Sequence, residues 1–320
     1  MRMLATAEVP AIGREKLADL GTLQISRGCL PSEVADVDIL LVRAERVDAQ
    51  TLTAAKRLRA IARTGVGVDN VDVTAASERG IAVLNAPVAG TAAVAEGAWA
   101  LILAAAKRLG ELRACVEQGR WAHRYAIEGL DLHGATLGIV GLGSIGREVA
   151  RIGLAFGMRV LAVDPRLSDD LPLERAVERT DLEDLVRRSD VISLHCELDE
   201  SNRGLINRRL LSLARRRPVL VNAARGGVVD GDELLLEALR EGWLSAVGLD
   251  VFATEPLRPD SPLLEDPRVI LTPHSIGLTR EWNERVFDAI AADLRTLLSG
   301  GRPRNIVNPQ VLAESKPVLS

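Results

Sequence analysis

The 320-residue sequence predicts an α/β protein of two domains, each built around a parallel sheet. Short apolar segments alternate with helical segments along most of the chain, and a fresh series of them begins near residue 136. A chain of this length can form two separate cores. Because the second series lies in mid-chain, we expect one domain to be inserted in the other. The predicted boundaries are 1–98 with 285–320 for the outer domain and 99–284 for the inserted domain.

The outer domain is expected to have four strands, at residues 3–6, 38–42, 59–63 and 81–84. Helices are expected between them, at 12–20, 51–56 and 73–79. A long alanine-rich segment, residues 92–109, is apolar on nearly all sides. Such a helix is expected to be buried between layers or between domains.

The inserted domain is expected to contain six strands with helices between them. They are predicted at residues 136–140, 159–163, 190–195, 218–222, 246–249 and 269–271. A last helix, about 279–298, returns the chain to the outer domain. The two crossings between domains predict a hinged cleft, which is a common place for a small ligand.

A glycine-rich loop follows the first strand of this series, in the order Gly141-Leu142-Gly143-Ser144-Ile145-Gly146. A helical segment comes next, and the second strand ends at Asp164. Strand, glycine loop, helix and terminal carboxylate together are typical of a Rossmann dinucleotide site. A carboxylate at Asp164 would repel a 2′-phosphate, which favours NAD as the cofactor. Arg166, two residues later, keeps NADP open as the alternative.

A second glycine cluster, Gly65-Val66-Gly67-Val68-Asp69-Asn70, also follows a strand but lacks the third glycine. Main-chain N–H groups in such a loop suit a small anion. A second dinucleotide site and a purely structural turn remain as alternatives.

Composition argues against several other classes of protein. The net charge is −4 and the pI about 5.7, so binding to nucleic acid is not expected. Three cysteines and four histidines show no disulfide or metal-ligand spacing, and no metal is expected. The longest apolar stretch, residues 98–106, is too short for a membrane span, and no signal peptide is visible. These features predict a cytoplasmic protein with no membrane partner.

Three more segments lie at predicted strand ends, where α/β sheets bind ligands, and they contain Arg225, Glu255 and His274. Taken singly, each has an ordinary explanation: a surface ion pair, a turn acid before proline, and a loop histidine. Together with residues 65–72, 85–87, 119–121 and 132–165, the chain resembles the D-isomer-specific 2-hydroxyacid dehydrogenase family. It looks most like short 3-phosphoglycerate dehydrogenases and glyoxylate/hydroxypyruvate reductases.

The resemblance implies a Rossmann cofactor domain inserted into a discontinuous, flavodoxin-like substrate domain. It implies hydride transfer between NAD(H) and a small D-2-hydroxy or 2-oxo acid. His274 would act as acid and base, Glu255 would orient it, and Arg225 would bind the substrate carboxylate. Formate dehydrogenase is disfavoured, because that branch has glutamine where Glu255 stands.

The resemblance also implies the remaining site residues. Asp250 would contact the nicotinamide carboxamide, and Asp164 the adenosine ribose. The full cofactor set is Gly141, Gly143, Ser144, Ile145, Gly146, Asp164, His195, Cys196, Ala223, Ala224, Arg225, Asp250, His274 and Gly277. The substrate set is Arg43, Val66, Gly67, Arg225 and His274.

Some assignments stay open. Arg43 matches a family position near the distal end of the substrate, but a surface ion pair explains it equally well. Trp282 either caps the cleft or lies on an apolar helix face. Glu197 and Asn202 stand where the family usually has proline and threonine. A homodimer with residues 100–135 as the exchanged arm is implied by the resemblance, and an NAD(H)-sensing corepressor on the same fold is the rival hypothesis.

Overall fold

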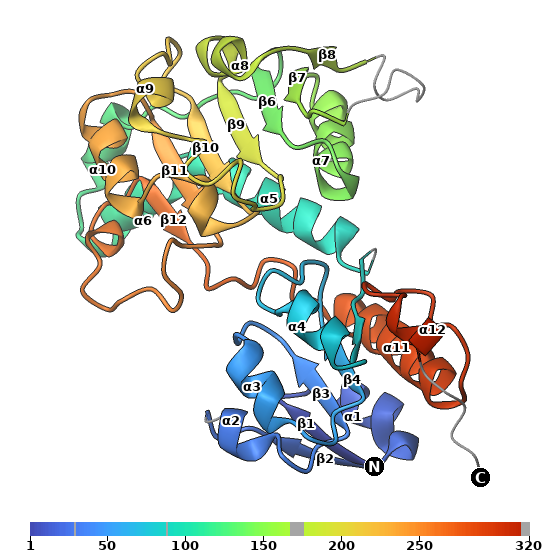
Figure 1. Ribbon diagram of the computed structural model, residues 1–320. Helices are drawn as coiled ribbons and strands as arrows, with labels where there is room; N and C mark the ends of the chain where they lie inside the picture. Colours follow the sequence, from blue (N-terminus) through green and yellow to red (C-terminus); the bar gives the residue numbers. More distant parts are fainter. Residues whose placement is uncertain (29, 88, 167–175, 315–320) are drawn as a thin grey trace. The chain divides into compact units, whose positions relative to one another are not determined.

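The computed structural model describes residues 1–28, 30–87, 89–166 and 176–314. The chain forms two compact units, coloured along the sequence in Figure 1: Met1–Gly90 with Leu278–Ser320, the outer unit, and Thr91–Gly277, the inserted unit. The divisions follow residues 90 and 277, rather than 98 and 284 as predicted. They fall earlier because helix α5 (Thr91–Ala106) packs as one piece against strands β10 and β11 of the inserted unit.

The outer unit contains a five-stranded parallel sheet in the order β2-β1-β3-β4-β5. This is the strand order of flavodoxin-like folds. The strands are β1 (Arg2–Ala5), β2 (Thr22–Ile25), β3 (Ile39–Val42), β4 (Ala60–Arg63) and β5 (Ala82–Leu84). Strand β2 was not predicted, because it is a partly exposed edge strand without a continuous apolar run.

Helices cover this sheet. Helices α2, α3 and α4 share a core with the strand residues of one face, whereas α1 packs against α11, which also contacts β4. Asp48, Asp72 and Thr279 cap the first turns of α3, α4 and α11 with their side-chain oxygens. The elements are α1 (Ala11–Leu17), η1 (Ala18–Leu20), α2 (Leu30–Glu33), α3 (Ala49–Ala54), α4 (Val73–Glu78), α11 (Arg280–Leu298) and α12 (Val311–Glu314).

The inserted unit contains a seven-stranded parallel sheet in the order β12-β11-β10-β9-β6-β7-β8. The core of this order is the doubly wound arrangement of Rossmann folds. The strands are β6 (Thr136–Val140), β7 (Arg159–Val163), β8 (Glu178–Arg179), β9 (Val191–Leu194), β10 (Val219–Asn222), β11 (Ala246–Leu249) and β12 (Val269–Leu271). The two-residue strand β8 was not predicted, and both of its residues are exposed.

Helices lie on both faces of the larger sheet. One core joins α5 and α7 to the sheet, and a second joins α8, α9 and α10 to its opposite face. The helix predicted at 92–109 ends at Ala106, because Arg108 adopts a left-handed conformation with φ 57°. The elements are α6 (Leu109–Glu117), η2 (Trp121–Ala126), α7 (Ser144–Ala155), α8 (Leu182–Arg188), α9 (Arg208–Leu211), η3 (Gly226–Val228), α10 (Asp232–Arg240) and η4 (Pro262–Leu264).

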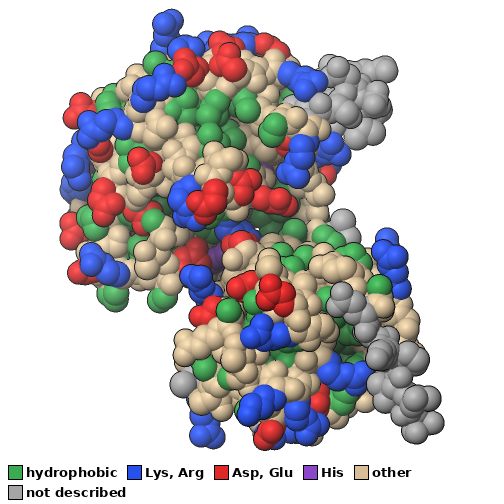
Figure 2. Space-filling model, in the orientation of Figure 1, with side chains coloured by type: hydrophobic (Ala, Val, Ile, Leu, Met, Phe, Trp, Pro, Cys, Tyr) green, Lys and Arg blue, Asp and Glu red, His purple; other side chains and the backbone are tan. Residues whose placement is uncertain are grey.

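Because every described strand pair in this sheet is parallel, the carboxyl ends meet along one edge. The loops after β6, β7, β9, β10 and β11 therefore gather most of the predicted site residues. On the face drawn in Figure 2, acidic and basic side chains are interspersed over each unit. Among the described residues, no helix is long and apolar enough to cross a bilayer.

Candidate active site

The glycine-rich loop connects β6 to α7, and two of its glycines are required by close backbone packing. Gly141 has φ 91°, and a Cβ there would lie 2.6 Å from the Cys196 nitrogen. A Cβ on Gly146 would lie 2.1 Å from the Gly141 carbonyl oxygen. Any side chain at either position would force β6, α7 and the loop after β9 apart.

The middle glycine has a different environment. A Cβ on Gly143 would meet no atom within 4 Å, so the backbone there is open. Ser144 and Ile145 begin helix α7, and the N–H groups of a first helical turn have no partner within the helix. An open glycine before free N–H donors fits a pyrophosphate group. The residues present therefore fit a dinucleotide cofactor.

Asp164 ends β7 beside this loop. Its Oδ2 accepts a hydrogen bond from the Leu142 N–H at 2.7 Å, and its Oδ1 accepts one from the Arg166 N–H at 2.8 Å. The carboxylate is thus fixed against the glycine loop.

His195 and Cys196 follow β9 on the other side of the same loop. The Ser193 hydroxyl and His195 Nε2 are 2.7 Å apart, while the buried Nδ1 has no hydrogen-bond partner among the described residues. Burial lowers the pKa of His195 to about 4, so its ring is neutral at physiological pH. Burial, with nearby carboxylates, raises the pKa of the Cys196 thiol to about 11. Both groups are uncharged and suit contact with an aromatic ring system better than proton transfer.

Arg225 follows β10, and the buried Asn222 shapes its loop. Asn222 Nδ2 donates to the Arg225 carbonyl at 2.9 Å, and its Oδ1 accepts from the Ala224 N–H at 3.0 Å. Arg225 Nη1 donates to the Ala224 carbonyl at 2.8 Å. Gly226 allows the loop after β11 to approach closely, because a Cβ there would lie 1.9 Å from the Phe252 carbonyl oxygen.

The loops after β11 and β12 bring Glu255 and His274 together. Glu255 Oε2 and His274 Nδ1 are 2.7 Å apart, and Glu255 Oε1 accepts from the Phe252 N–H at 3.1 Å. Burial raises the pKa of Glu255, but the contact with His274, the Phe252 N–H and the charge of Arg225 outweigh it and lower that pKa overall. Glu255 is therefore ionised well below neutral pH.

The His274 backbone is strained. Its φ of 51° is left-handed, which costs a non-glycine residue about 1–2 kcal/mol. The His274 N–H donates to the carbonyls of Asp250 at 2.8 Å and Thr272 at 3.0 Å, which hold this conformation. Such strain is concentrated at functional sites.

Asp250, in the loop after β11, holds the loop after β12 through hydrogen bonds. This buried carboxylate accepts at Oδ1 from Thr272 Oγ1 at 2.7 Å, the Ser275 N–H at 2.7 Å and the Ile276 N–H at 3.2 Å. Burial raises the pKa of Asp250, and these donors only partly offset it. Sequence reasoning did not include Asn222 and Thr272 in the site. The usable signal was their position as polar residues where a buried strand ends.

Three of the predicted substrate residues lie in the outer unit. The Arg43 guanidinium lies 5.2 Å from the ring centroid of Trp282, which is buried on α11, as the helix-face interpretation expects. Burial lowers the pKa of Arg43, and Glu45 opposes the shift. In the loop after β4, the Val66 carbonyl accepts from Asn85 Nδ2 at 2.8 Å, and the Val66 side chain is exposed.

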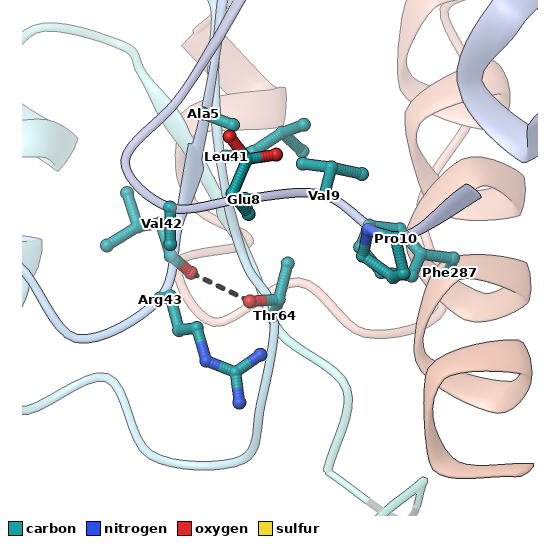
Figure 3. Close-up of a pocket in the computed structure, with 10 residues that line it drawn as sticks. Ala5, Glu8, Val9, Pro10, Leu41, Val42, Arg43, Thr64 and Phe287 are labelled. Atoms are coloured by element: carbon teal, nitrogen blue, oxygen red, sulfur yellow. Dashed lines mark hydrogen bonds between the residues drawn. The ribbon is translucent and has the colours of Figure 1, made fainter. Parts of the chain in front are cut away.

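A small pocket of about 20 Å³ lies beside Arg43, between the ends of β1 and β3 and Phe287 of α11. In Figure 3 the Arg43 guanidinium lies below Thr64, whose hydroxyl donates to the Val42 carbonyl at 3.2 Å. This volume holds about one water molecule.

Comparison with known proteins identifies the family. Residues 99–275 match the model described as "D-isomer specific 2-hydroxyacid dehydrogenase, NAD binding domain". The chain belongs to the D-isomer specific 2-hydroxyacid dehydrogenase family. It is 38% identical to a glyoxylate reductase of Korarchaeum cryptofilum, over 99% of this chain and 98% of that protein.

Two further members of the family show its range. A D-3-phosphoglycerate dehydrogenase of Methanocaldococcus jannaschii is 37% identical over 94% of this chain, but the match spans only 58% of that longer protein. The structure of D-lactate dehydrogenase from Aquifex aeolicus, in complex with NAD and lactic acid, is 30% identical with a TM-score of 0.85 and covers 96% of this chain and 99% of that one. The predicted fold, the NAD-binding domain and the class of enzyme are thereby confirmed: the chain is a D-2-hydroxyacid dehydrogenase.

Proposed function

We propose that this dehydrogenase reduces a small 2-oxo acid with NADH, and runs the reverse oxidation of the D-2-hydroxy acid. The observation that supports it most is the 2.7 Å contact between His274 Nδ1 and Glu255 Oε2, with Arg225 close enough to lower the pKa of Glu255. An acid, its orienting carboxylate and a carboxylate-binding guanidinium are what the reaction requires. Relatives named as glyoxylate reductase and phosphoglycerate dehydrogenase indicate the candidate substrates.

His274 is assigned as the acid and base. When bound, NADH would supply a hydride to the carbonyl carbon of the substrate, and the carbonyl oxygen would gain negative charge as the C=O double bond opens. His274 delivers a proton to that oxygen from Nε2, since Nδ1 faces Glu255. In the oxidation direction, neutral His274 takes the proton from the hydroxyl group.

Glu255 and Arg225 support that proton transfer. Glu255 is ionised, so it fixes the ring orientation and stabilises the charged imidazole. Arg225 binds the substrate carboxylate through two parallel hydrogen bonds, which orients the carbonyl carbon toward the hydride donor.

The cofactor is placed on the loops of the inserted unit. Gly141, Gly143, Ser144, Ile145 and Gly146 hold the pyrophosphate, and Asp164 binds the adenosine ribose. The uncharged His195 and Cys196, with Ala223, Ala224, Asp250 and Gly277, complete the contacts. Asp164 favours NAD over NADP, because its carboxylate stands where a 2′-phosphate would need a cation.

The substrate roles of Arg43, Val66 and Gly67 stay predictions. A half-buried guanidinium stacked on Trp282 suits a second anionic group on the substrate, such as a phosphate. A homodimer formed through residues 100–135 and a cytoplasmic location also belong to this proposal. Exposed apolar side chains at Leu109, Val116, Trp121 and Tyr125 support the dimer, since they lie in this segment.

His274→Ala tests the assignment. Loss of one positioned acid is expected to lower kcat by about 10²–10⁴-fold, while the NADH dissociation constant stays within about twofold. Near-normal turnover would refute the role of His274. A panel of glyoxylate, hydroxypyruvate and phosphohydroxypyruvate separates the enzyme from a corepressor-like NAD(H) sensor, which would bind NADH and consume none with any of them.

A further inference from the structure

Two oppositely charged side chains face each other beside the glycine loop. Strands β7 and β9 both pair with β6, so the residues that follow them lie on either side of the loop after β6. Arg166 follows β7 and Glu197 follows β9. Arg166 Nη2 and Glu197 Oε2 are 4.0 Å apart, and both side chains are largely exposed.

The main chain fixes the position of Arg166. Its N–H donates to Asp164 Oδ1 at 2.8 Å, while Asp164 Oδ2 accepts from the glycine-loop residue Leu142 at 2.7 Å. The main chain of Arg166 therefore lies beside the Asp164 carboxylate, which is assigned to the adenosine ribose. A guanidinium at this place is the group that binds the 2′-phosphate of NADP in dinucleotide folds.

Glu197 is one of three carboxylates near Cys196, at the ends of β7 and β9. Burial is the main cause that raises the pKa of Cys196 to about 11, and the charges of Asp164, Asp199 and Glu197 raise it further. Among these three carboxylates, Glu197 lies 4.0 Å from the Arg166 guanidinium, while Asp199, whose pKa is lowered mainly by its hydrogen bonds to Ser201, also interacts with the charge of Arg166.

We propose that Glu197 is a second residue that determines cofactor specificity: it pairs with Arg166 and withholds that guanidinium from a 2′-phosphate. Asp164 would favour the ribose hydroxyls, and Glu197 would deny NADP the guanidinium of Arg166. This inference rests on the proposed placement of the cofactor. Because both side chains are exposed and their charged atoms are 4.0 Å apart, the effect of the pair is expected to be moderate and to weaken with salt.

The test measures dissociation constants for NADH and NADPH from nucleotide fluorescence, without turnover. In Glu197→Gln, NADPH is expected to bind about three- to fivefold more tightly at low salt, while NADH affinity stays within about twofold. Glu200→Gln is the matched control. Glu200 is an exposed acid on the same loop, but its partner is Arg203 at 3.8 Å, so its substitution is expected to change neither constant.

A second pair of variants tests the mechanism. In an Arg166→Ala background, Glu197→Gln is expected to give no gain for NADPH, because there is no guanidinium to release. Glu197→Asp is expected to retain most of the preference for NADH. The proposal is overturned if Glu197→Gln leaves NADPH affinity unchanged, if Glu200→Gln produces the same gain, or if the gain persists without Arg166. A wild-type protein that binds neither nucleotide would instead refute the cofactor site itself.

Discussion

The two glycine-rich loops both follow a parallel strand, but their glycines are packed against different kinds of atoms. In the inserted unit, a Cβ on Gly146 would lie 2.1 Å from a main-chain oxygen. In the outer unit, a Cβ on Gly65 would lie 2.0 Å from Arg63 Nη1, the far end of a flexible side chain. The first loop is fixed by backbone packing, whereas the second is bounded by a group that can move.

The polar groups differ in the same way. In the inserted unit, the loops after β11 and β12 are joined by the contacts of Glu255 with His274 and of Asp250 with Thr272, both at 2.7 Å. Glu255 also accepts from the Phe252 N–H of its own loop at 3.1 Å. In the outer unit, the loop offers mainly main-chain groups around an exposed Val66, and Arg43 rests on an aromatic ring. We infer that the inserted unit carries the chemistry shared by the family, and that the outer unit adjusts which acid is accepted.

The largest expected difference between the units comes from their arginines. Arg225→Lys is expected to lower kcat/KM by about 10²–10³-fold for every 2-oxo acid, because an ammonium cannot form two parallel bonds to a carboxylate. Arg43→Lys keeps the charge and loses only the stacking on Trp282, so a loss below about tenfold is expected. Steady-state kinetics with glyoxylate and phosphohydroxypyruvate measures both. Equal losses in the two variants would break the comparison.

The glycines give the next largest effect. Gly146→Ala is expected to destabilise the protein by about 2–4 kcal/mol and to abolish NADH binding, because main chain must move. Gly65→Ala is expected to cost less than about 1 kcal/mol, since the Arg63 side chain can turn aside. Thermal unfolding and NADH titration of both variants supply the measurement. A Gly65→Ala protein as unstable as Gly146→Ala would show that both loops are equally fixed.

The same contrast explains what the sequence could predict. The glycine loop, Asp164 and the strands around them were predictable, because each has a local pattern with one physical meaning. The link between Glu255 and His274 joins residues 19 positions apart, and only the resemblance to a family implied it. Thr272 acts through a hydrogen bond to Asp250, 22 positions away, and Asn222 through bonds within its own loop, so the only signal in the sequence was a polar residue where a buried strand ends. The edge strand β2 was missed because its residues alternate without a buried run.

Arg43→Met tests whether the outer unit selects the substrate. Removing a charge-assisted hydrogen bond costs about 1.5–3 kcal/mol, which corresponds to about a 10- to 100-fold rise in KM for a phosphorylated 2-oxo acid. Glyoxylate has no distal anion, so its KM is expected to change less than threefold. KM values for both substrates with the same protein preparation provide the comparison. An equal rise in KM for both substrates would show that Arg43 does not select between them.

The smallest effect concerns the buried carboxylate that holds the inserted unit's loops. Burial raises the pKa of Asp250, so the folded protein binds its proton more tightly than the unfolded chain does. Stability from this group is therefore present below the unfolded pKa and is lost as pH rises through the higher folded pKa. Asp250→Asn keeps an oxygen acceptor for Thr272 and cannot ionise.

Asp250→Asn is thus expected to match the wild type in stability near pH 3.5 and to exceed it by at most about 1 kcal/mol at pH 7. Urea unfolding of both proteins across this range measures the difference. Asp232→Asn provides a comparison, because burial also raises the pKa of Asp232, whose Oδ1 accepts one long hydrogen bond from the Ala253 N–H at 3.4 Å instead of the three donors at Asp250. A stability advantage that shrinks as pH rises would show that charge–donor attraction outweighs burial at Asp250, and that this network favours the ionised form.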